Sequence, residues 1–544
     1  IQKDVIASDH ELLQITPTAR KARQAYKLLH DFQAGFTNDE AAEDHRAFLR
    51  WQKTWEKMLS EKGWIDPCTI ISFISKAIDS GKIKVDSGLI FAGFDDFNPV
   101  QISLQDSLQR AGCSVAIFND HAAATVNNGV IAAPDNTTEV EQCARWARKL
   151  VTENPKVQIG IVAPHLELYK NLVSQKFLDE FDPTGKVLGG EQLLPFNISL
   201  GDPLANEGPV FAALKLLTLA RTVDVDELSW LLRTPYIHSA TARYGQRGST
   251  DVKFRKKRLS ELPLWKLTGA LKSVGCDTAF TDVIEALVEF QKSSRKDLPG
   301  VWAERFALTL QSCGWPGDRT LSSHEYQAVE KFREVLSGRA TFDAVSGPVD
   351  RSFSTTLVLR LTNESTFQPE SRGSQVQSLG VREAGGGRLD QCGVLGMHAG
   401  AMPQPLRPNP FIPLAAQRRK QMPHADANRE LDYAKRLIKR LSASASNVIY
   451  SWPLNEEGIQ NRPSALLNSL DPVDLPTLPS MAPASAVFSS RRPLETISDY
   501  KVTPLISKKP VSGGTAIVKD QALCPFRAFA HHRLNSKGIE SPDI

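Results

Sequence analysis

The sequence of 544 residues predicts an α/β fold in which a mostly helical insertion interrupts a parallel sheet. Compact apolar runs bounded by turn residues, at residues 89–92, 114–118 and 158–163, have the pattern of buried parallel strands. Amphipathic helix patterns separate these runs. No convincing strand pattern occurs at residues 234–346, which are mostly helical and charged, and strand-like runs resume after them. This alternation predicts helices packed on a parallel sheet.

Capping and proline signals predict the helix boundaries of the first half. Thr138 and Glu141 have the spacing of a capping box at the start of a helix. Pro209 suits the first turn of another helix. A further helix begins near Asp226 and ends just before Pro235, because proline disfavours helix in the residue that precedes it.

The second half contains further strand-like runs and then a linker. The runs cover residues 356–361, 376–379, 392–397 and 447–452. Residues 461–512 are rich in proline, serine and alanine, which is a linker composition. A separate unit then begins at residue 513 with a strand-like run at residues 515–518.

Composition narrows the class of protein. The length predicts three or four domains of about 150 residues each. A net charge of +4 is too small for the whole protein to attract nucleic acid by its overall field. Any nucleic-acid site must therefore be a local basic patch. The 7 cysteines are scattered and never spaced C-x-x-C, which fits a reducing compartment and argues against a zinc site. No apolar run reaches the roughly 18 residues of a membrane span. We therefore expect a cytoplasmic protein with no membrane partner.

Phosphate-binding motifs are missing from the sequence. No G-x-x-x-x-G-K-[ST] loop occurs, and the glycines at 385–387 have no strand running directly into them. Asp95 and Asp96 follow a strand-like run, where an ATPase would hold Mg²⁺. The favoured interpretation of these two acids is a solvated turn or a helix cap.

A basic cluster is the candidate nucleic-acid site. The candidate residues are Arg243, Arg247, Lys253, Arg255, Lys256, Lys257 and Arg258. Such a run can neutralise phosphates. Tyr244 and Phe254, which lie among these bases in the sequence, could stack on nucleic-acid bases. The alternative is a solvated helix face without a partner.

Two N-terminal stretches resemble superfamily 1 helicases. "ITPTARKARQAY" at residues 15–26 is similar to a degenerate form of the first DNA-contact motif, T-x-T-x-x-A-A, which implies DNA contacts for the Thr-Pro-Thr stretch centred on Pro17 and for Arg20. "LIFAGFDDFNPVQ" at residues 89–101 resembles the Walker B region in the inactivated helicase half of AddB-type proteins. Gly-Phe stands there in place of the Asp-Glu pair.

Later stretches resemble the same family. Residues 376–405 are similar to a helicase segment that has lost its Lys-Gly-Leu-Glu core, and residues 429–453 to the last helicase motif without its arginine. "GGTAIVKDQALCPFRAFAHHRL" at residues 513–534 resembles the entry to a RecB-family nuclease domain of the PD-(D/E)xK type. Bacterial probable DNA repair proteins fuse such a nuclease to an inactivated helicase.

The resemblance implies a domain organisation. Residues 1–150 would be a degenerate first helicase-like domain, 151–233 with 347–460 a second RecA-like domain, 234–346 a helical insertion, 461–512 a linker, and 513–544 the start of the nuclease. The nuclease core, with its Mg²⁺ ligands, would follow Ile544.

The implied function is that of an inactivated helicase-like scaffold, which binds single-stranded DNA or duplex ends. It would serve a Mg²⁺-dependent RecB-family exonuclease in double-strand-break repair or recombination, without ATPase or nuclease activity of its own. One alternative is a non-catalytic interaction subunit that docks onto an active helicase partner. A second is a DNA-dependent ATPase whose Walker A motif lies upstream of the chain.

Cys524 has two interpretations. In AddB-type proteins a cysteine at this motif is one ligand of a 4Fe–4S cluster, which requires four thiolates. No other cysteine lies near Cys524 in the sequence, and His531 and His532 do not complete a four-ligand set. The favoured interpretation is a small buried residue beside Phe526 and Phe529, so we expect no cofactor in this chain.

Overall fold

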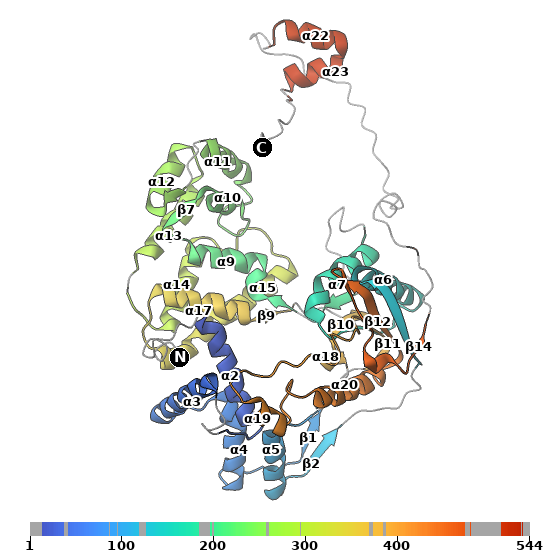
Figure 1. Cartoon of the computed structure of the whole chain (residues 1–544). Coiled ribbons are helices and arrows are strands. Elements are labelled where there is room, and N and C mark those ends of the chain that lie inside the picture. The colour runs from blue at the N-terminus through green and yellow to red at the C-terminus, as the bar shows by residue number, and fades with distance from the viewer. Residues whose placement is uncertain are drawn as a thin grey trace. The chain divides into compact units, whose positions relative to one another are not determined.

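The computed structural model describes residues 14–36, 42–85, 87–94, 96–118, 127–183, 196–198, 201–256, 261–293, 295–368, 374–384, 388–473, 479, 513–534 and 536. The chain divides into two compact units, Ile1–Val487 and Phe488–Ile544 (Figure 1). Within the described ranges, no helix is long and apolar enough to cross a membrane.

A large parallel sheet organises the first unit. Among the described residues it has eight strands, seven of them in the order β14-β3-β12-β11-β4-β10-β5, and each neighbouring pair in that order is parallel. The strands are β3 (Asn127–Asp135), β4 (Ile159–Ala163), β5 (Phe196–Ile198), β10 (Val376–Gly380), β11 (Leu389–Val394), β12 (Ala445–Glu456), β13 (Ile459–Gln460) and β14 (Asp471–Pro472). β13 pairs antiparallel with β12. The predicted α/β fold with a parallel sheet is confirmed.

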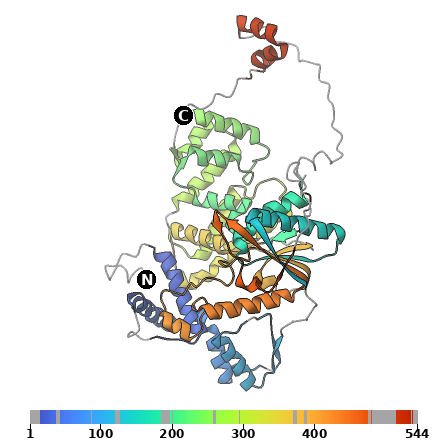
Figure 2. The ribbon, with the colours of Figure 1, turned by 45° about the vertical axis from the view of Figure 1, so that its right-hand side comes forward.

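Helices cover both faces of this sheet (Figure 2). α6 (Asn136–Glu153) and α7 (Leu166–Phe181) pack with Ile159 and Ile161 of β4 in one apolar cluster. Val162 points to the opposite cluster, which it shares with α20 (Ala427–Ser442) and α18 (Val381–Ala384). The alternation along β4 is the period-2 pattern of a strand buried on both faces.

Sequence patterns located four of the eight described strands and missed β3, β5, β13 and β14. The runs at 158–163, 376–379 and 447–452 lie in β4, β10 and β12, and the run at 392–397 overlaps β11. β3 opens with Asn-Asn-Gly and contains a proline, residues typical of turns, yet it pairs along β12 from Asn127 to Asp135. Pairing with a neighbouring strand therefore overrides its local preference.

The helix after β3 begins earlier than its sequence predicts. Asp135 is the N-cap of α6, because its Oδ1 accepts a hydrogen bond from the Thr138 amide at 2.7 Å. The predicted capping box of Thr138 and Glu141 is therefore wrong. The predicted domain boundary at residue 150 falls inside α6, whose apolar side belongs to the sheet.

A helical insertion leaves the sheet and returns through a narrow antiparallel pair, β6 (Asp202–Pro203) with β9 (Thr366–Phe367). One apolar core, from Leu204 to Phe367, joins its elements. These are η3 (Leu204–Asn206), α9 (Gly208–Thr218), β7 (Thr222–Asp224), α10 (Val225–Arg233), α11 (Tyr244–Lys256), β8 (Glu261–Pro263), α12 (Leu264–Ser273), α13 (Thr278–Lys292), α14 (Pro299–Ser312), α15 (Ser323–Ser337), η4 (Gly338–Phe342), α16 (Asp343–Ser346) and α17 (Arg351–Glu364). The insertion is thus wider than the predicted 234–346.

The strand predicted at 356–361 is part of helix α17. Asp350 caps this helix by accepting from the Phe353 amide at 2.8 Å. Leu357 and Val358 are buried on the core side, so packing overrides the β preference of the local Thr-Thr-Leu-Val run. The proline-ended helix predicted from Asp226 matches α10.

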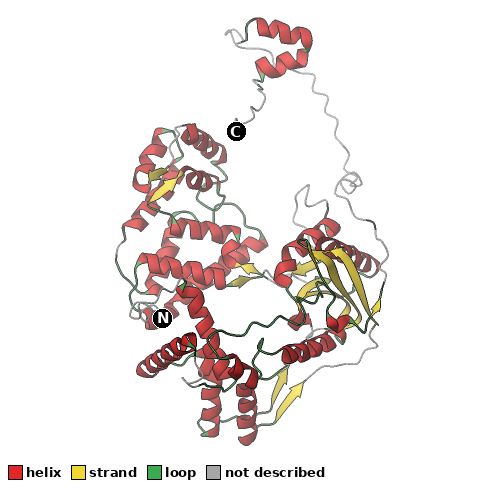
Figure 3. Ribbon diagram, in the orientation of Figure 1, coloured by secondary structure: helices red, strands yellow, loops and turns green. Residues whose placement is uncertain are grey.

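The N-terminal segment is mostly helical (Figure 3). It consists of α2 (Ile15–Asp31), α3 (Glu43–Lys62), η2 (Pro67–Thr69), α4 (Ile70–Asp79), β1 (Leu89–Ala92), α5 (Pro99–Arg110) and β2 (Val115–Phe118). β1 and β2, the predicted runs at 89–92 and 114–118, form their own two-stranded parallel sheet. This segment packs on α19 (Leu414–Arg419), which comes from far along the chain.

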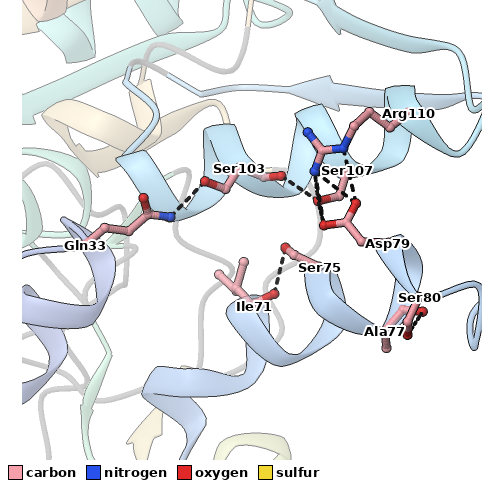
Figure 4. A network of polar contacts seen from close by, with 9 residues as sticks. All are labelled: Gln33, Ile71, Ser75, Ala77, Asp79, Ser80, Ser103, Ser107 and Arg110. Atoms are coloured by element: carbon pink, nitrogen blue, oxygen red, sulfur yellow. Dashed lines mark hydrogen bonds and ion pairs between the residues drawn. The ribbon is translucent and has the colours of Figure 1, made fainter.

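Polar contacts tie α2, α4 and α5 together (Figure 4). Ser107 and Arg110 of α5 turn toward Asp79 of α4, with Arg110 Nη2 2.9 Å from Asp79 Oδ1. Gln33, just after α2, donates to Ser103 Oγ at 2.8 Å. The three helices therefore form a single support for the β1–β2 sheet.

The predicted linker begins too early. Leu467 belongs to the core under the sheet, and β14 pairs with β3. Residue 479 apart, residues 474–512 lie outside the described part of the chain.

In the second unit, residues 515–518 are helical rather than the predicted strand. They begin α22 (Thr515–Leu523), which α23 (Pro525–Ala528) and η6 (Phe529–Arg533) follow. The Asp520 carboxylate of α22 forms an ion pair with Arg527 and lies within hydrogen-bond distance of His531 and His532 in the following turns. These contacts link α22 to α23 and η6.

Candidate nucleic-acid interface

Helix α11 carries all described members of the predicted basic cluster except Arg243, which directly precedes it, and part of the cluster is structural. Arg247 is fully buried, and its Nε lies 3.0 Å from Asp277 Oδ2. Its guanidinium also lies over the Phe280 ring, with 5.2 Å between them. We remove Arg247 from the candidate DNA contacts, because a phosphate could reach it only by breaking a buried ion pair.

Other members of the run have partners within the insertion. Lys253 Nζ donates to the Val274 carbonyl at 2.7 Å, at the end of α12. Arg255 lies 3.2 Å from Asp226 and 3.3 Å from Asp251. These contacts join α10, α11 and α12 and reduce the charge offered to DNA.

The remaining members are exposed or not described. Arg243 and Lys256 are exposed, while Lys257 and Arg258 lie outside the described residues. Phe254 is fully buried, so its predicted base stacking is wrong, whereas Tyr244 is 67% exposed.

Helix α2 separates an apolar face from a basic one. Its buried residues, which pack against α3 and the α19 region, are Ala22, Ala25, Tyr26 and Leu29. The outward side chains include the four bases Arg20, Lys21, Arg23 and Lys27. Asp31 is the single acid within the helix, so the outward face is basic.

The Thr-Pro-Thr stretch that the helicase resemblance singled out forms the first turn of α2. Thr16 and Pro17 are exposed, whereas Thr18 Oγ1 donates to the Gln14 carbonyl at 2.7 Å. Proline has no backbone N–H, so a hydrogen bond from this turn to a phosphate would come from Thr16. The turn and the exposed Arg20 are therefore both accessible to a ligand.

A second basic helix packs on the same apolar cluster. Phe411, Ile412 and Ala416 of the α19 region share that cluster with α2, and Asn409 Nδ2 donates to the Lys21 carbonyl at 3.1 Å. The side chains that follow are exposed bases: Arg418, Arg419 and Lys420. Sequence analysis missed this run because α2, its neighbour in the fold, is far away in the sequence.

We call these seven side chains the α2–α19 basic surface: Arg20, Lys21, Arg23, Lys27, Arg418, Arg419 and Lys420. Two are partly neutralised, because Arg20 lies 3.8 Å from Glu364 and Lys27 lies 2.6 Å from Asp31. In the described part of the chain, Lys21, Arg23, Arg419 and Lys420 have no ion-pair partner. They are free to contact an external anion.

The carboxyl edge of the parallel sheet is occupied by a side chain of the protein. Ligands of parallel α/β sheets bind at this edge, where Glu139 of α6 is almost fully buried. Its carboxylate accepts from the Gly396 amide at 2.9 Å, Ser451 Oγ at 2.6 Å and Tyr169 OH at 2.8 Å. Burial raises the pKa of Glu139, an effect that these three hydrogen bonds oppose.

The turn above this carboxylate is tightly packed. Gly396 has a φ of +69°, and an added Cβ would lie 2.9 Å from the Tyr169 ring. Glycine is therefore required both by the backbone conformation and by the contact. A phosphate group at this edge would meet a buried carboxylate instead of a ring of free amides.

The structure brings two of the helicase-like stretches together. Asp96 Oδ2, in the loop after β1, lies 3.3 Å from Arg436 Nη2 and 3.7 Å from Arg429 Nη2 of α20. Asp96 is thus an ion-pair partner, whereas Asn98 supplies the cap of α5. Asp95 and the glycines at 385–387 lie outside the described residues.

Cys524 is exposed, which contradicts the favoured interpretation of a buried residue. Phe526, one of the two rings expected to pack beside it, is 71% exposed. Nowhere in the described ranges do three His, Cys, Asp or Glu side chains form a group that could hold a metal ion.

Comparison of the sequence with protein-family models and with curated proteins gave no match.

Proposed function

We propose that this chain is a helicase-like scaffold that binds DNA through phosphate contacts and does not hydrolyse ATP. The observation that carries the proposal is the α2–α19 basic surface. Seven exposed basic side chains from two distant segments are held on one apolar cluster, and four of them have no described ion-pair partner. Lysine and arginine arranged in this way release counterions from DNA, which is the main source of sequence-independent affinity.

The sheet architecture supports a helicase type of scaffold. A parallel sheet interrupted by a helical insertion agrees with the RecA-like domain that the resemblance implies. Arg20 and the Thr-Pro-Thr stretch around Pro17, to which the resemblance assigns DNA contacts, lie on the same helix as the free bases Lys21 and Arg23.

Two observations argue against nucleotide hydrolysis. The buried and hydrogen-bonded carboxyl group of Glu139 fills the carboxyl edge of the sheet, and Asp96 is engaged by Arg429 and Arg436. The sequence also lacks a phosphate loop.

The resemblance of residues 513–534 extends the proposal to the whole protein. A scaffold of this kind would position DNA for a RecB-family, Mg²⁺-dependent exonuclease in double-strand-break repair or recombination. The Mg²⁺ ligands would come from the nuclease core. Because Cys524 is exposed, its thiol is accessible to serve as one ligand of the iron–sulfur cluster that the resemblance implies.

Fluorescence anisotropy with labelled single-stranded DNA and blunt duplex tests the DNA proposal. The test variant replaces Lys21, Arg23, Arg419 and Lys420 with Gln. The control variant replaces four exposed bases of the insertion, each in a local ion pair, with Gln: Lys272, Lys292, Lys331 and Arg333. Both variants lose the same net charge.

We expect the test variant to lose affinity for all DNA sequences while the control binds like the native chain. Equal loss in both variants would mean that only net charge matters. No loss in the test variant would remove the α2–α19 surface from the proposal and leave Arg243 and Lys256 as the described candidates.

A second candidate function is the non-catalytic interaction subunit. The outer face of the β1–β2 sheet consists of Ile90, Ala92, Ala116 and Phe118, with Ile90 71% and Phe118 56% exposed. Exposed apolar faces of this kind mark protein contacts. A chain that serves only for docking would show no salt-dependent DNA affinity.

A further inference from the structure

The contact between Asp96 and α20 joins the N-terminal segment to the helices of the parallel sheet. The N-terminal helices pack on the α19 region, where the Phe48 and Phe411 rings lie 6.1 Å apart and the Trp51 and Phe411 rings 5.6 Å apart. We call this packing the α19 pivot. Asp96, in the loop between β1 and α5, contacts α20 through the ion pairs of its carboxylate.

The loop that carries Asp96 is built to hold it in place. Phe94 and Phe97 stack at 4.8 Å, and both pack on Phe91 at 5.9 and 5.8 Å. Asn98 follows at once as the cap of α5, accepting from the Gln101 amide at 2.9 Å. Among the described residues of this loop, these contacts hold the neighbours of Asp96 in place.

The partner surface on α20 is equally ordered. Arg429, Tyr433 and Arg436 lie on one stripe of the helix, and each guanidinium is 5.9 Å from the Tyr433 ring. Arg382 approaches the same ring at 5.7 Å. The opposite face of α20 is fixed in the core under the sheet.

We propose that Asp96 with Arg429 and Arg436 forms a reversible ion-pair latch that sets the orientation of the N-terminal segment on the parallel sheet, with the α19 pivot as its hinge. The latch is weak enough to open, because the Asp96 and Arg436 side chains are 47% and 49% exposed and Arg429, 15% exposed, pairs more closely with Glu430, at 2.8 Å. Exposed pairs shift a two-state equilibrium by up to about fivefold, and salt screens them. The α2–α19 surface lies on the pivot side, so opening the latch changes the position of the sheet relative to that surface.

Distance measurement between two spin labels tests the latch without using DNA. The labels replace Gln109 on α5 and Lys439 on α20, both exposed. The background lacks the more accessible thiols, with alanine at Cys68, Cys276 and Cys524. Circular dichroism confirms that each variant is folded.

We expect a narrow distance distribution at low salt that broadens in about 0.5 M NaCl, where the Debye length falls to about 4 Å. Asp96→Asn and Arg436→Gln should each broaden it at low salt, Asp96→Asn the more because it removes both contacts, and the double variant should broaden it no further than Asp96→Asn alone. Asp106→Asn, which removes an exposed carboxylate of α5, is the control and should keep the native distribution. A broad native distribution, or an unchanged one in Asp96→Asn, overturns the latch.

Discussion

Replacing Glu139 with Ala tests the claim that a buried carboxylate organises the carboxyl edge of the sheet. The change leaves three donors without their acceptor: the Gly396 amide, Ser451 Oγ and Tyr169 OH. A buried donor without a partner costs about 1–3 kcal/mol. The two hydroxyls can rotate toward water that enters the vacated space, whereas the amide cannot. We therefore expect a loss of about 2–5 kcal/mol in the free energy of unfolding of the sheet.

Urea unfolding gives the global effect, and hydrogen exchange of α6 and β12 peptides shows whether the loss is local. The control is Glu139→Gln, which keeps an acceptor for the Gly396 amide but cannot ionise. Because burial raises the pKa of Glu139 in the folded state, its contribution is fully present below the unfolded pKa and is lost as pH rises through the folded pKa. Glu139→Gln should abolish that part of the pH dependence. A change below about 0.5 kcal/mol in Glu139→Ala, the range of surface substitutions, would refute the reasoning.

Three further predictions concern other parts of the chain. The purified chain should release no phosphate from ATP in the presence of single-stranded DNA, and measurable DNA-stimulated turnover would contradict the scaffold proposal. Arg247→Ala should destabilise the insertion by about 3–5 kcal/mol, because it leaves buried Asp277 unpaired, whereas Arg243→Ala should change stability by less than about 0.5 kcal/mol in the same denaturation assay. Burial alone would raise the pKa of Glu325, but hydrogen bonds, chiefly from Arg319, lower it to about 2. The stability it contributes is present above its unfolded pKa and should be lost as pH falls toward 2, and an acid titration of Arg319→Gln by circular dichroism should show a smaller acid-induced loss.

Local sequence patterns correctly predicted those elements whose intrinsic secondary-structure preference matches the structure that tertiary packing favours. β4, β10 and β12 combine apolar runs with burial on both faces, so sequence and packing favour the same structure. β3 was missed because it is stabilised by pairing with β12, hundreds of residues later in the chain. α17 was mistaken for a strand because burial of its apolar side, which depends on other helices, determines its structure. Such long-range contacts leave no local trace in a single sequence.

The candidate site shows the same limit. The basic run around α11 looked like a phosphate surface, but Arg247 finds Asp277 and Arg255 finds Asp226 across the fold. The run at residues 418–420 became part of a surface only when α19 packed on α2. Charge can be counted from the sequence, whereas its availability depends on tertiary pairing.

The salt dependence of DNA binding tests the scaffold proposal most directly. For single strands, each phosphate contact contributes about −0.7 to the slope of log K against log salt concentration. The native chain should show a steep negative slope, and the variant with Gln at Lys21, Arg23, Arg419 and Lys420 should show one that is shallower by up to about 3. An affinity and a slope that are the same in the two proteins would contradict the account.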